Sequence, residues 1–245
     1  MHPDACRLVA LTLGLVVVLA APCHGQASEE TIDPALEHVL RALEPGWYAR
    51  LDTGKGVILA RLLPEQAPQS VAHFAGLARG TLEWADPVSG KTPTAPYYDG
   101  GRVDRALAGR LFAVGQRSAD GVFGPALWVP EDEGTGPIHF GNAPSALGLV
   151  SASFGRTSAV QFFVTAAVQR GLSPRHPCFG VVVHGQDVAF NISQVKTDPG
   201  GKPIEPVMIE RVRVFAVGDP PPLPEPERHQ PTLRNIDFVG TREQP

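Results

Sequence analysis

The residues of this chain that could bind a metal or act as nucleophiles are not spaced for those tasks. The eight histidines and three cysteines form no His-x-x-x-His pair and no cysteine–histidine cluster with the spacing of a metal site. The chain has no Gly-x-Ser-x-Gly elbow, no Gly-x-x-x-x-Gly-Lys phosphate loop and no dinucleotide fingerprint after a strand. The acidic run at 131–133 is typical of a solvated loop. We therefore expect neither a metal nor another cofactor.

Spacing alone assigns no function to this chain, and four residues become candidates only through a family resemblance: Arg105, Gln161, Phe163 and His176. Each has an ordinary interpretation when it is considered alone. An arginine next to Asp104 is usually a surface ion pair worth under about 1 kcal/mol. The Gln-Phe-Phe-Val run is typical of a core strand, and a histidine before a proline fits a turn. Only their joint order, compared with the motifs of a known family, favours a functional role for the first three and leaves both interpretations of His176 open.

That order resembles the cyclophilins, a family of peptidyl-prolyl cis-trans isomerases. Residues 98–109, YDGGRVDRALAG, resemble the family segment YDGxxFHRVIPG. Residues 52–80 resemble its first hairpin and helix, residues 161–165, QFFVT, resemble its QFFIT strand, and the spacing of residues 172–188 also agrees. The resemblance covers about residues 47–217. It implies a mainly β fold, a closed eight-stranded antiparallel barrel capped by two helices, with a groove on its outer face that isomerises X-Pro peptide bonds.

The resemblance also implies roles for individual residues. Arg105 matches the arginine whose guanidinium is aimed at the prolyl nitrogen. Gln161 matches the glutamine that holds the substrate backbone. The walls and rim of the implied proline pocket, and a pair that offers backbone hydrogen bonds, fall on these positions: Phe163, Leu172, His176, Leu111, Arg110, Ala152 and Ser153.

Several of these positions depart from the family pattern. Val103-Asp104 stand where Phe-His precedes the arginine, and Ala113 replaces the glutamine that orients it. Arg110 replaces a pocket phenylalanine and brings a second charge, although its aliphatic stem could still cover a proline ring. Leu111 replaces methionine with little change in volume. Gly171 replaces an aromatic residue at the groove's edge, which should weaken drugs that dock there, such as cyclosporin. We therefore expect reduced or redirected activity.

The apolar pattern places these residues on short strands. Residues 48–63 have the pattern of two strands joined by a turn, and residues 67–78 have helical spacing with a glycine just past the end. Further short apolar runs, broken by glycine and proline, predict strands at 111–114, 149–151, 161–165, 179–183 and 207–215. The 25 prolines disfavour long helices. The pattern alone therefore predicts a sandwich or a closed barrel.

The two ends of the chain differ from its middle. Residues 8–21 form an apolar run that is shorter than the roughly 20 residues of a membrane span and fits a secretory signal. We expect residues 1–27 to be a signal peptide and residues 28–46 to form an amphipathic helix or spacer. The domain would then cover 47–218. Residues 219–245 would form a semi-rigid, proline-rich tail.

Export and charge limit the possible partners. We expect the protein in the periplasm or outside the cell, with membrane association as an alternative if Cys23 carries a lipid, which Pro22 disfavours. Cys178 would be the remaining thiol and could form no internal disulfide, which suits an oxidising compartment. A net charge of −4 argues against nucleic acid as a partner. We expect a monomer without a membrane span that binds proline-containing polypeptides.

Three hypotheses follow from these observations. The first is an isomerase of X-Pro bonds in exported proteins, with reduced or altered activity. The second is a non-catalytic module that binds proline-containing segments, which the changes at Arg110, Ala113 and Gly171 favour. The third is a structural part of a larger envelope assembly, with the tail as its contact.

Overall fold

The computed structural model describes residues 34–84, 94–116, 133, 136–152, 156–172 and 176–226. The expected signal peptide and the end of the expected tail, residues 227–245, lie outside this part of the chain. The described elements are, in chain order, α1 (Pro34–Arg41), β1 (Gly46–Thr53), β2 (Gly56–Leu62), α2 (Pro68–Arg79), β3 (Gly101–Leu107), β4 (Leu111–Val114), β5 (Ala146–Ala152), β6 (Arg156–Thr165), β7 (Cys178–His184), α3 (Gln186–Ser193) and β8 (Met208–Val217).

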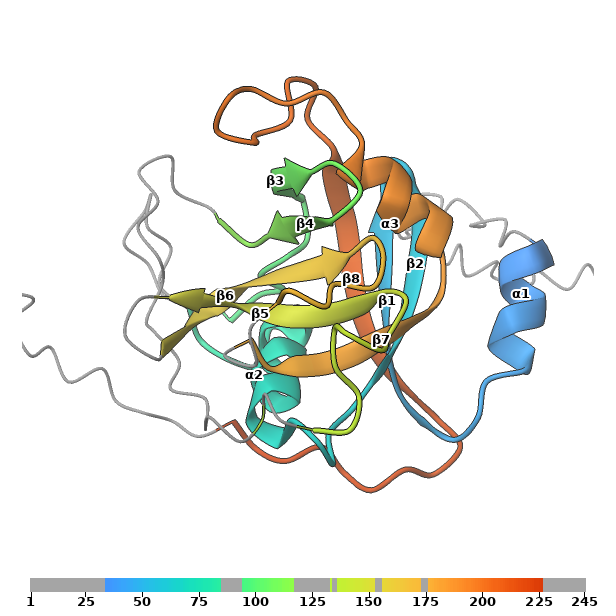
Figure 1. Ribbon diagram of the computed structural model, residues 1–245. Coiled ribbons are helices and arrows are strands. Elements are labelled where there is room, and N and C mark those ends of the chain that lie inside the picture. Colours follow the sequence, from blue (N-terminus) through green and yellow to red (C-terminus); the bar gives the residue numbers. More distant parts are fainter. Residues whose placement is uncertain are drawn as a thin grey trace, which may run out of the picture.

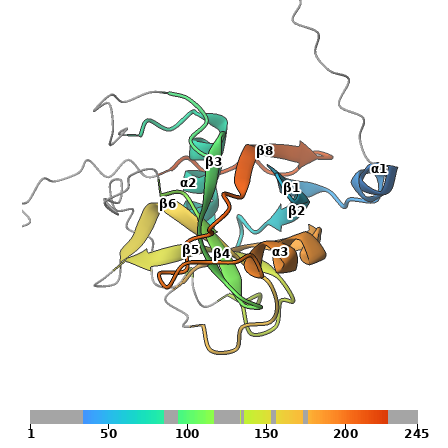
Figure 2. The same cartoon turned by 90° about the horizontal axis from the view of Figure 1, so that it is seen from above.

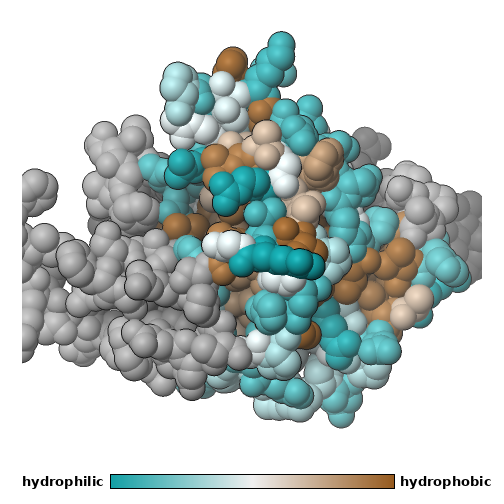
Figure 3. Space-filling view, in the orientation of Figure 1, coloured by the Kyte–Doolittle hydropathy of each residue, from teal (hydrophilic) through white to brown (hydrophobic). Residues whose placement is uncertain are grey.

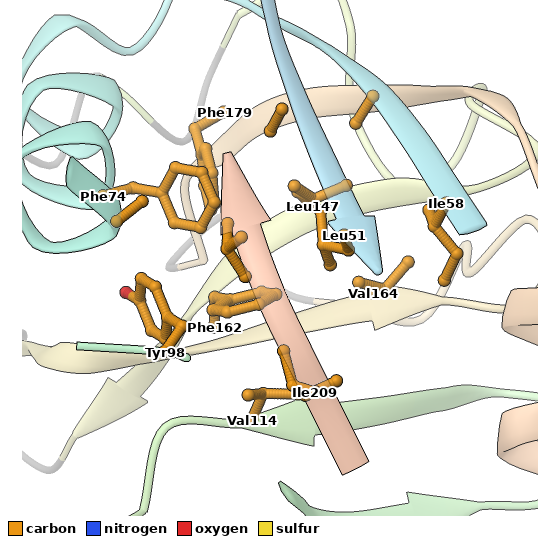
Figure 4. Packing of buried hydrophobic residues seen from close by; sticks show 14 of the residues in the cluster. Leu51, Ile58, Phe74, Tyr98, Val114, Leu147, Phe162, Val164, Phe179 and Ile209 are labelled. Carbon is orange, nitrogen blue, oxygen red and sulfur yellow. The ribbon is translucent and has the colours of Figure 1, made fainter. Parts of the chain in front are cut away.

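The strands close into an antiparallel barrel in the order β1-β2-β7-β5-β6-β4-β3-β8 (Figures 1 and 2). The first two form a hairpin in which Thr53 pairs with Gly56. Because successive residues of a strand point to opposite faces, alternate side chains fill the barrel. The buried interior includes Leu51, Ile58, Val114, Leu147, Phe162, Val164 and Ile209 (Figure 4). The fold class that the resemblance implies is thus confirmed.

Two helices close the ends of this interior. Phe74 of α2 stacks among three core rings, with its centroid 5.4 Å from that of Tyr98, 5.2 Å from Phe162 and 5.1 Å from Phe179. At the other end, Ile192 of α3 enters the same apolar core (Figure 1). This continuous packing fixes the barrel wall against which any surface site must be built.

The first turn of α2 is capped by a residue from a distant loop. The N-cap residue, Ala67, provides no side-chain cap. Instead the Glu133 carboxylate accepts hydrogen bonds from the Gln69 N–H at 2.7 Å, the Ser70 N–H at 3.0 Å and the Ser70 hydroxyl at 2.6 Å. It satisfies N–H groups that a helix leaves without partners and complements the positive end of the helix dipole. Glu133 is only 3% exposed, so the interpretation of this residue as part of a solvated loop was wrong.

The segment before β1 forms a short helix beside the barrel. Glu37 and Arg41 of α1 form an ion pair one turn apart, and the Glu44 carboxylate beyond the helix meets Arg61 of β2 at 3.0 Å. Figure 3 shows hydrophobic residues at the side of the barrel that faces α1. None of the described helices combines the length and apolar character needed to cross a membrane.

Candidate functional site

Three neighbouring strands align an arginine, an alanine and a phenylalanine in one row on the outside of the barrel. Arg105 of β3 pairs with Ala113 of β4, which pairs in turn with Phe163 of β6. Directly paired residues of antiparallel strands share a face of the sheet. The neighbours Phe112 and Phe162 point into the core, so the row must point outward. The sheet register therefore brings the predicted catalytic residue and the predicted pocket wall to the same face.

A β-bulge gives Arg105 this direction. Val103 pairs with Val114 and is buried in the core, whereas Arg105 pairs with Ala113, so Asp104 is one extra residue on β3. Without the bulge, Arg105 would share the inward face of Val103, because side chains alternate. Bulges re-aim side chains in this way, often beside active sites. The exposed side chain of Arg105 is thus a consequence of one inserted residue.

The inserted residue also ties β3 to the end of β4. One carboxylate oxygen of Asp104 accepts the backbone N–H of Gln116 at 2.6 Å. Burial raises the pKa of Asp104 to about 6, although this hydrogen bond and the nearby charge of Arg102 favour the ionised form. The carboxylate therefore holds the bulge from which Arg105 projects.

The loop after α3 supports the stem of Arg105. A Cβ atom on Gly201 would lie 3.1 Å from Arg105 Cγ and 3.3 Å from its Nε, so the arginine rests directly on this glycine. Gly201 has a φ of +85°, and its carbonyl accepts the Ala106 N–H at 2.8 Å. Asp198 holds the loop by accepting the Gly200 and Lys202 N–H groups. A larger residue at 201 would displace the arginine.

Beyond Ala113 in the same row, Phe163 forms the centre of an apolar cluster on the outer face. Its ring centroid lies 5.2 Å from that of Phe140, and it meets the His176 ring edge-on at 5.3 Å. The cluster also contains residues from β4, β5, β7 and the loops: Ala113, Ala143, Ala146, Cys178, Leu111, Ile138, Val150, Leu172 and Val181. Leu111 and Leu172 remain partly exposed, as pocket walls must.

His176 and Gln161 border this cluster. Nδ1 of His176 lies 3.0 Å from the Leu149 carbonyl, which can only accept, so Nδ1 carries the proton in this contact. Gln161 lies two residues before Phe163 on β6 and so on the same face, and it is 6% exposed. Gln161 is thus held on a barrel strand, whereas His176 precedes β7 and is tied to β5 through the Leu149 carbonyl.

Two of the altered positions are open to solvent. Arg110 lies exposed in the turn between β3 and β4, where its backbone N–H donates to the Leu107 carbonyl at 2.8 Å. A Cβ atom on Gly171 would meet no atom of the described residues within 4 Å, so this position has room for a side chain. Ala152 ends β5 and pairs with Arg156. Within the described part of the chain, histidine, cysteine and acidic residues form no group that could hold a metal ion.

The sequence matches a protein-family model described as "Cyclophilin type peptidyl-prolyl cis-trans isomerase/CLD" over residues 48–214. The chain belongs to the cyclophilin family. Peptidyl-prolyl cis-trans isomerase B of Streptomyces anulatus is 35% identical over 170 residues, which cover 68% of this chain and 95% of that protein. Peptidyl-prolyl cis-trans isomerase A of Mycobacterium tuberculosis is 33% identical over 168 residues, or 68% of this chain and 91% of that protein.

Solved structures share the fold of this cyclophilin. A cyclophilin-type isomerase of Cryptosporidium parvum, crystallised in the presence of the dipeptide Ala-Pro, aligns with a TM-score of 0.51 at 20% identity. The alignment covers 69% of this chain and 98% of that chain. A second crystal structure of the same protein gives a TM-score of 0.52 at 18% identity.

In this cyclophilin, two features of the site were not predicted from the sequence. Phe140, which packs on Phe163, comes from a loop that no spacing rule connects to β6. Both rings lie over Gly148, where a Cβ atom would be 2.5 Å from each of them. The second feature is the bulge at Asp104, for which the family pattern has a histidine and whose role depends on strand pairing.

Proposed function

We propose that this cyclophilin accelerates the cis–trans isomerisation of X-Pro bonds in exported polypeptides, at a reduced rate. The observation that carries the proposal is the row on the outer face, in which Ala113 alone separates Arg105 from Phe163. Two strand spacings correspond to about 10 Å between their backbones. A substrate proline on Phe163 is therefore within reach of an arginine side chain from β3.

The reaction needs a fixed cation rather than a nucleophile. Amide resonance gives the X-Pro bond a rotational barrier of about 18–20 kcal/mol. In the twisted state the nitrogen regains its lone pair, and a donor aimed at that nitrogen stabilises the twisted state more than the planar one. Arginine suits this role because its guanidinium is always charged and presents several donors in a rigid plane.

The apolar cluster would hold the proline ring. Phe163 forms the floor, with Leu111 and Leu172 as half-buried walls. Burial of the ring against these side chains removes water from the surroundings of Arg105, and a charge acts more strongly when water is excluded. The cyclophilin-type isomerase crystallised with Ala-Pro supports a proline-containing ligand for this fold. Gln161, on the same face of β6, would hold the substrate backbone.

The reduced rate follows from what the site lacks. Ala113 faces outward between Arg105 and Phe163, but a methyl group cannot accept a hydrogen bond from the guanidinium. At the described groove edge, Gly171 contributes no side chain to hold the substrate. We therefore propose that Arg105 is less well oriented than in a site with the complete family pattern.

The test is the isomerisation rate of an X-Pro peptide, measured by NMR exchange, with Arg105→Ala and a matched control. Arg211 on β8 is an equally exposed arginine outside the row, so Arg211→Ala should retain the wild-type rate. We expect Arg105→Ala to lose at least tenfold of the acceleration, which corresponds to about 1.4 kcal/mol. Equal rates for wild type and Arg105→Ala would refute the proposal.

The second candidate function is a module that binds proline-containing segments without catalysis. The missing groups at Ala113 and Gly171 favour it. Peptide binding at Phe163 without any exchange between isomers would select this function. Absence of binding to any X-Pro peptide would exclude both candidates.

The exported location is also a proposal, and it rests on the apolar run at residues 8–21. We propose that the chain is cleaved near residue 27 and acts on polypeptides in the periplasm or outside the cell. Mass spectrometry of the protein from its native cells gives the mature N-terminus. A protein that retains residues 1–27 in the cytoplasm would contradict this location.

A further inference from the structure

The chain turns sharply where the barrel ends. Gly218 follows β8 with a φ of +67°, in the left-handed region, and a Cβ atom there would lie 3.0 Å from Pro45 Cβ. Only glycine adopts this conformation without strain. The turn directs residues 219–226 back across the outside of the barrel. We call these residues, DPPPLPEP, the strap.

The strap lies on a tryptophan of β1. The Trp47 indole N–H donates to the Pro221 carbonyl at 2.8 Å. The guanidinium carbon of Arg79 lies 4.8 Å from the centroid of the same indole, in a cation–π contact. Leu223, two residues further on, packs against the main core. The described part of the tail therefore has a defined seat on the barrel through Pro221 and Leu223.

This seat has the chemistry of a polyproline-binding site. A polyproline II segment forms no internal hydrogen bonds, so its carbonyl groups remain available to a partner. Grooves lined by aromatic side chains recognise such segments, which lose little entropy on binding because they are already extended. In this chain, Trp47 supplies both the aromatic surface and the donor.

The strap fills only part of the space beside it. A cavity of 1140 Å³ lies between the strap and the barrel, which is larger than the roughly 300–1,000 Å³ of most small-molecule sites. Its barrel side is mostly apolar, with Pro45, Trp47, Leu63, Pro64, Ile138 and Val183 among its residues, and it also includes Arg61, Glu65 and Gln66. We call this cavity, together with the seat on Trp47, the Trp47 groove.

The Trp47 groove is separate from the row at Arg105 but continuous with its surroundings. It is built on β1, β2 and β7, whereas the row lies on β3, β4 and β6. Ile138 and Val181 line the groove and also belong to the apolar cluster around Phe163. One extended polypeptide could therefore contact both places.

We propose that the Trp47 groove is a second peptide-binding site, for proline-rich segments in the polyproline II conformation, and that the strap occupies it in cis. The strap shows that the seat accepts a proline-rich segment, and the open cavity offers further surface to a longer one. Because the strap is covalently attached, it competes at a high effective concentration. An external segment therefore binds well only when the strap is released. No part of this proposal depends on Arg105.

The test uses the full-length chain with residues 219–226 replaced by alternating glycine and serine. The probe is a capped peptide with the strap sequence, DPPPLPEP, followed by NMR of the indole N–H groups. The Trp47 indole resonance should shift in the variant and should return toward its wild-type position as the peptide is added. The peptide should bind the wild-type chain at least tenfold more weakly than it binds the glycine–serine variant. Trp84 is buried, does not line the Trp47 groove and donates to the Ala95 carbonyl, so its resonance should not move.

Two controls establish the chemistry of recognition. A peptide with alanine in place of every proline should bind the glycine–serine variant at least tenfold more weakly than the strap peptide does, because it is not preorganised in an extended conformation. Trp47→Phe in the glycine–serine chain should remove binding while leaving X-Pro isomerisation at the wild-type rate. No peptide-dependent shift at Trp47, or equal binding of the two peptides, would overturn the proposal. If the glycine–serine chain does not fold, Leu223→Ala is used in its place to loosen the strap. Absence of a peptide-dependent shift at Trp47, or equal binding of the two peptides, would again overturn the proposal.

Discussion

Replacing Ala113 with glutamine should increase the isomerase activity of this cyclophilin. Ala113 is the direct cross-strand neighbour of Arg105, and the Cβ atoms of such pairs are about 4.5–5.5 Å apart. A glutamine at 113 can therefore place its amide oxygen within hydrogen-bond distance of the guanidinium. The substitution restores the group that the family pattern has at this position and that the strand pairing aims at the arginine.

The size of the gain follows from one hydrogen bond to a charged group. Such bonds contribute about 1.5–3 kcal/mol. If about 1.4 kcal/mol of this stabilises the twisted X-Pro bond by orienting Arg105 toward its nitrogen, kcat/KM rises tenfold. Ala113 is 8% exposed and packs in the apolar cluster. The longer side chain should therefore also cost about 1–3 kcal/mol of folding stability through overpacking.

The assay compares Ala113→Gln with Ala113→Met, which has nearly the same length but no amide. X-Pro isomerisation is measured for both variants and for each of them combined with Arg105→Ala. We expect a gain for glutamine alone, and only when Arg105 is present. An equal gain for methionine, or a gain that persists in the Arg105→Ala background, would refute the reasoning that the amide acts through the guanidinium.

Three further predictions concern the groove edge, the helix cap and pH. Gly171→Trp should bind cyclosporin up to about tenfold more tightly in a calorimetric titration, because the position is open and an aromatic contact contributes about 0.5–1.5 kcal/mol; unchanged affinity would contradict this. Glu133→Gln should lower the free energy of unfolding by about 1–3 kcal/mol in urea, since it weakens three hydrogen bonds at the start of α2, whereas Glu65→Gln on the surface should not. Burial raises the pKa of Asp104 to about 6, so its contribution to stability is present at low pH and is lost as the pH rises from about 4 to about 6. Burial lowers the pKa of His73 to about 4, so its contribution is lost as the pH falls from about 6.5 to about 4. Each contribution amounts to at most about 3 kcal/mol, and the two change in opposite directions, so the free energy of unfolding of the wild type should be nearly constant between pH 4 and 6. Asp104→Asn should lose stability on acidification, and His73→Gln should gain it. Parallel stability curves for all three proteins would exclude these assignments.

The sequence was sufficient to predict the barrel because the apolar pattern and the family motifs agree. The run from Gln161 to Val164 predicts a core strand, and in β6 Phe162 and Val164 do enter the core, whereas Phe163 belongs to the apolar cluster on the other face. Motif order also identified Leu111 and Leu172, which the structure brings to the same apolar cluster.

Other features depend on contacts between residues far apart in the chain. The outward direction of Arg105 results from the bulge at Asp104, and an extra residue is visible only when β3 is paired with β4. Glu133 caps a helix that begins more than sixty positions earlier. The strap is recognisable as a polyproline segment from its composition. Its contact with Trp47 could not be predicted, because the two residues are far apart in the sequence and meet only in the folded barrel.

The barrel has a further consequence for how the chain may be cut and rejoined. Gly46 at the start of β1 pairs with Val217 at the end of β8, so the first and last strands are neighbours in the wall. A few residues of linker could join these two positions and make the fold a continuous ring. New ends could then be opened in the exposed turn at Gly54-Lys55, and every strand would keep its partners. A circularly permuted barrel of this kind would lack both α1 and the strap, and the face that carries Arg105 could be studied without either appendage.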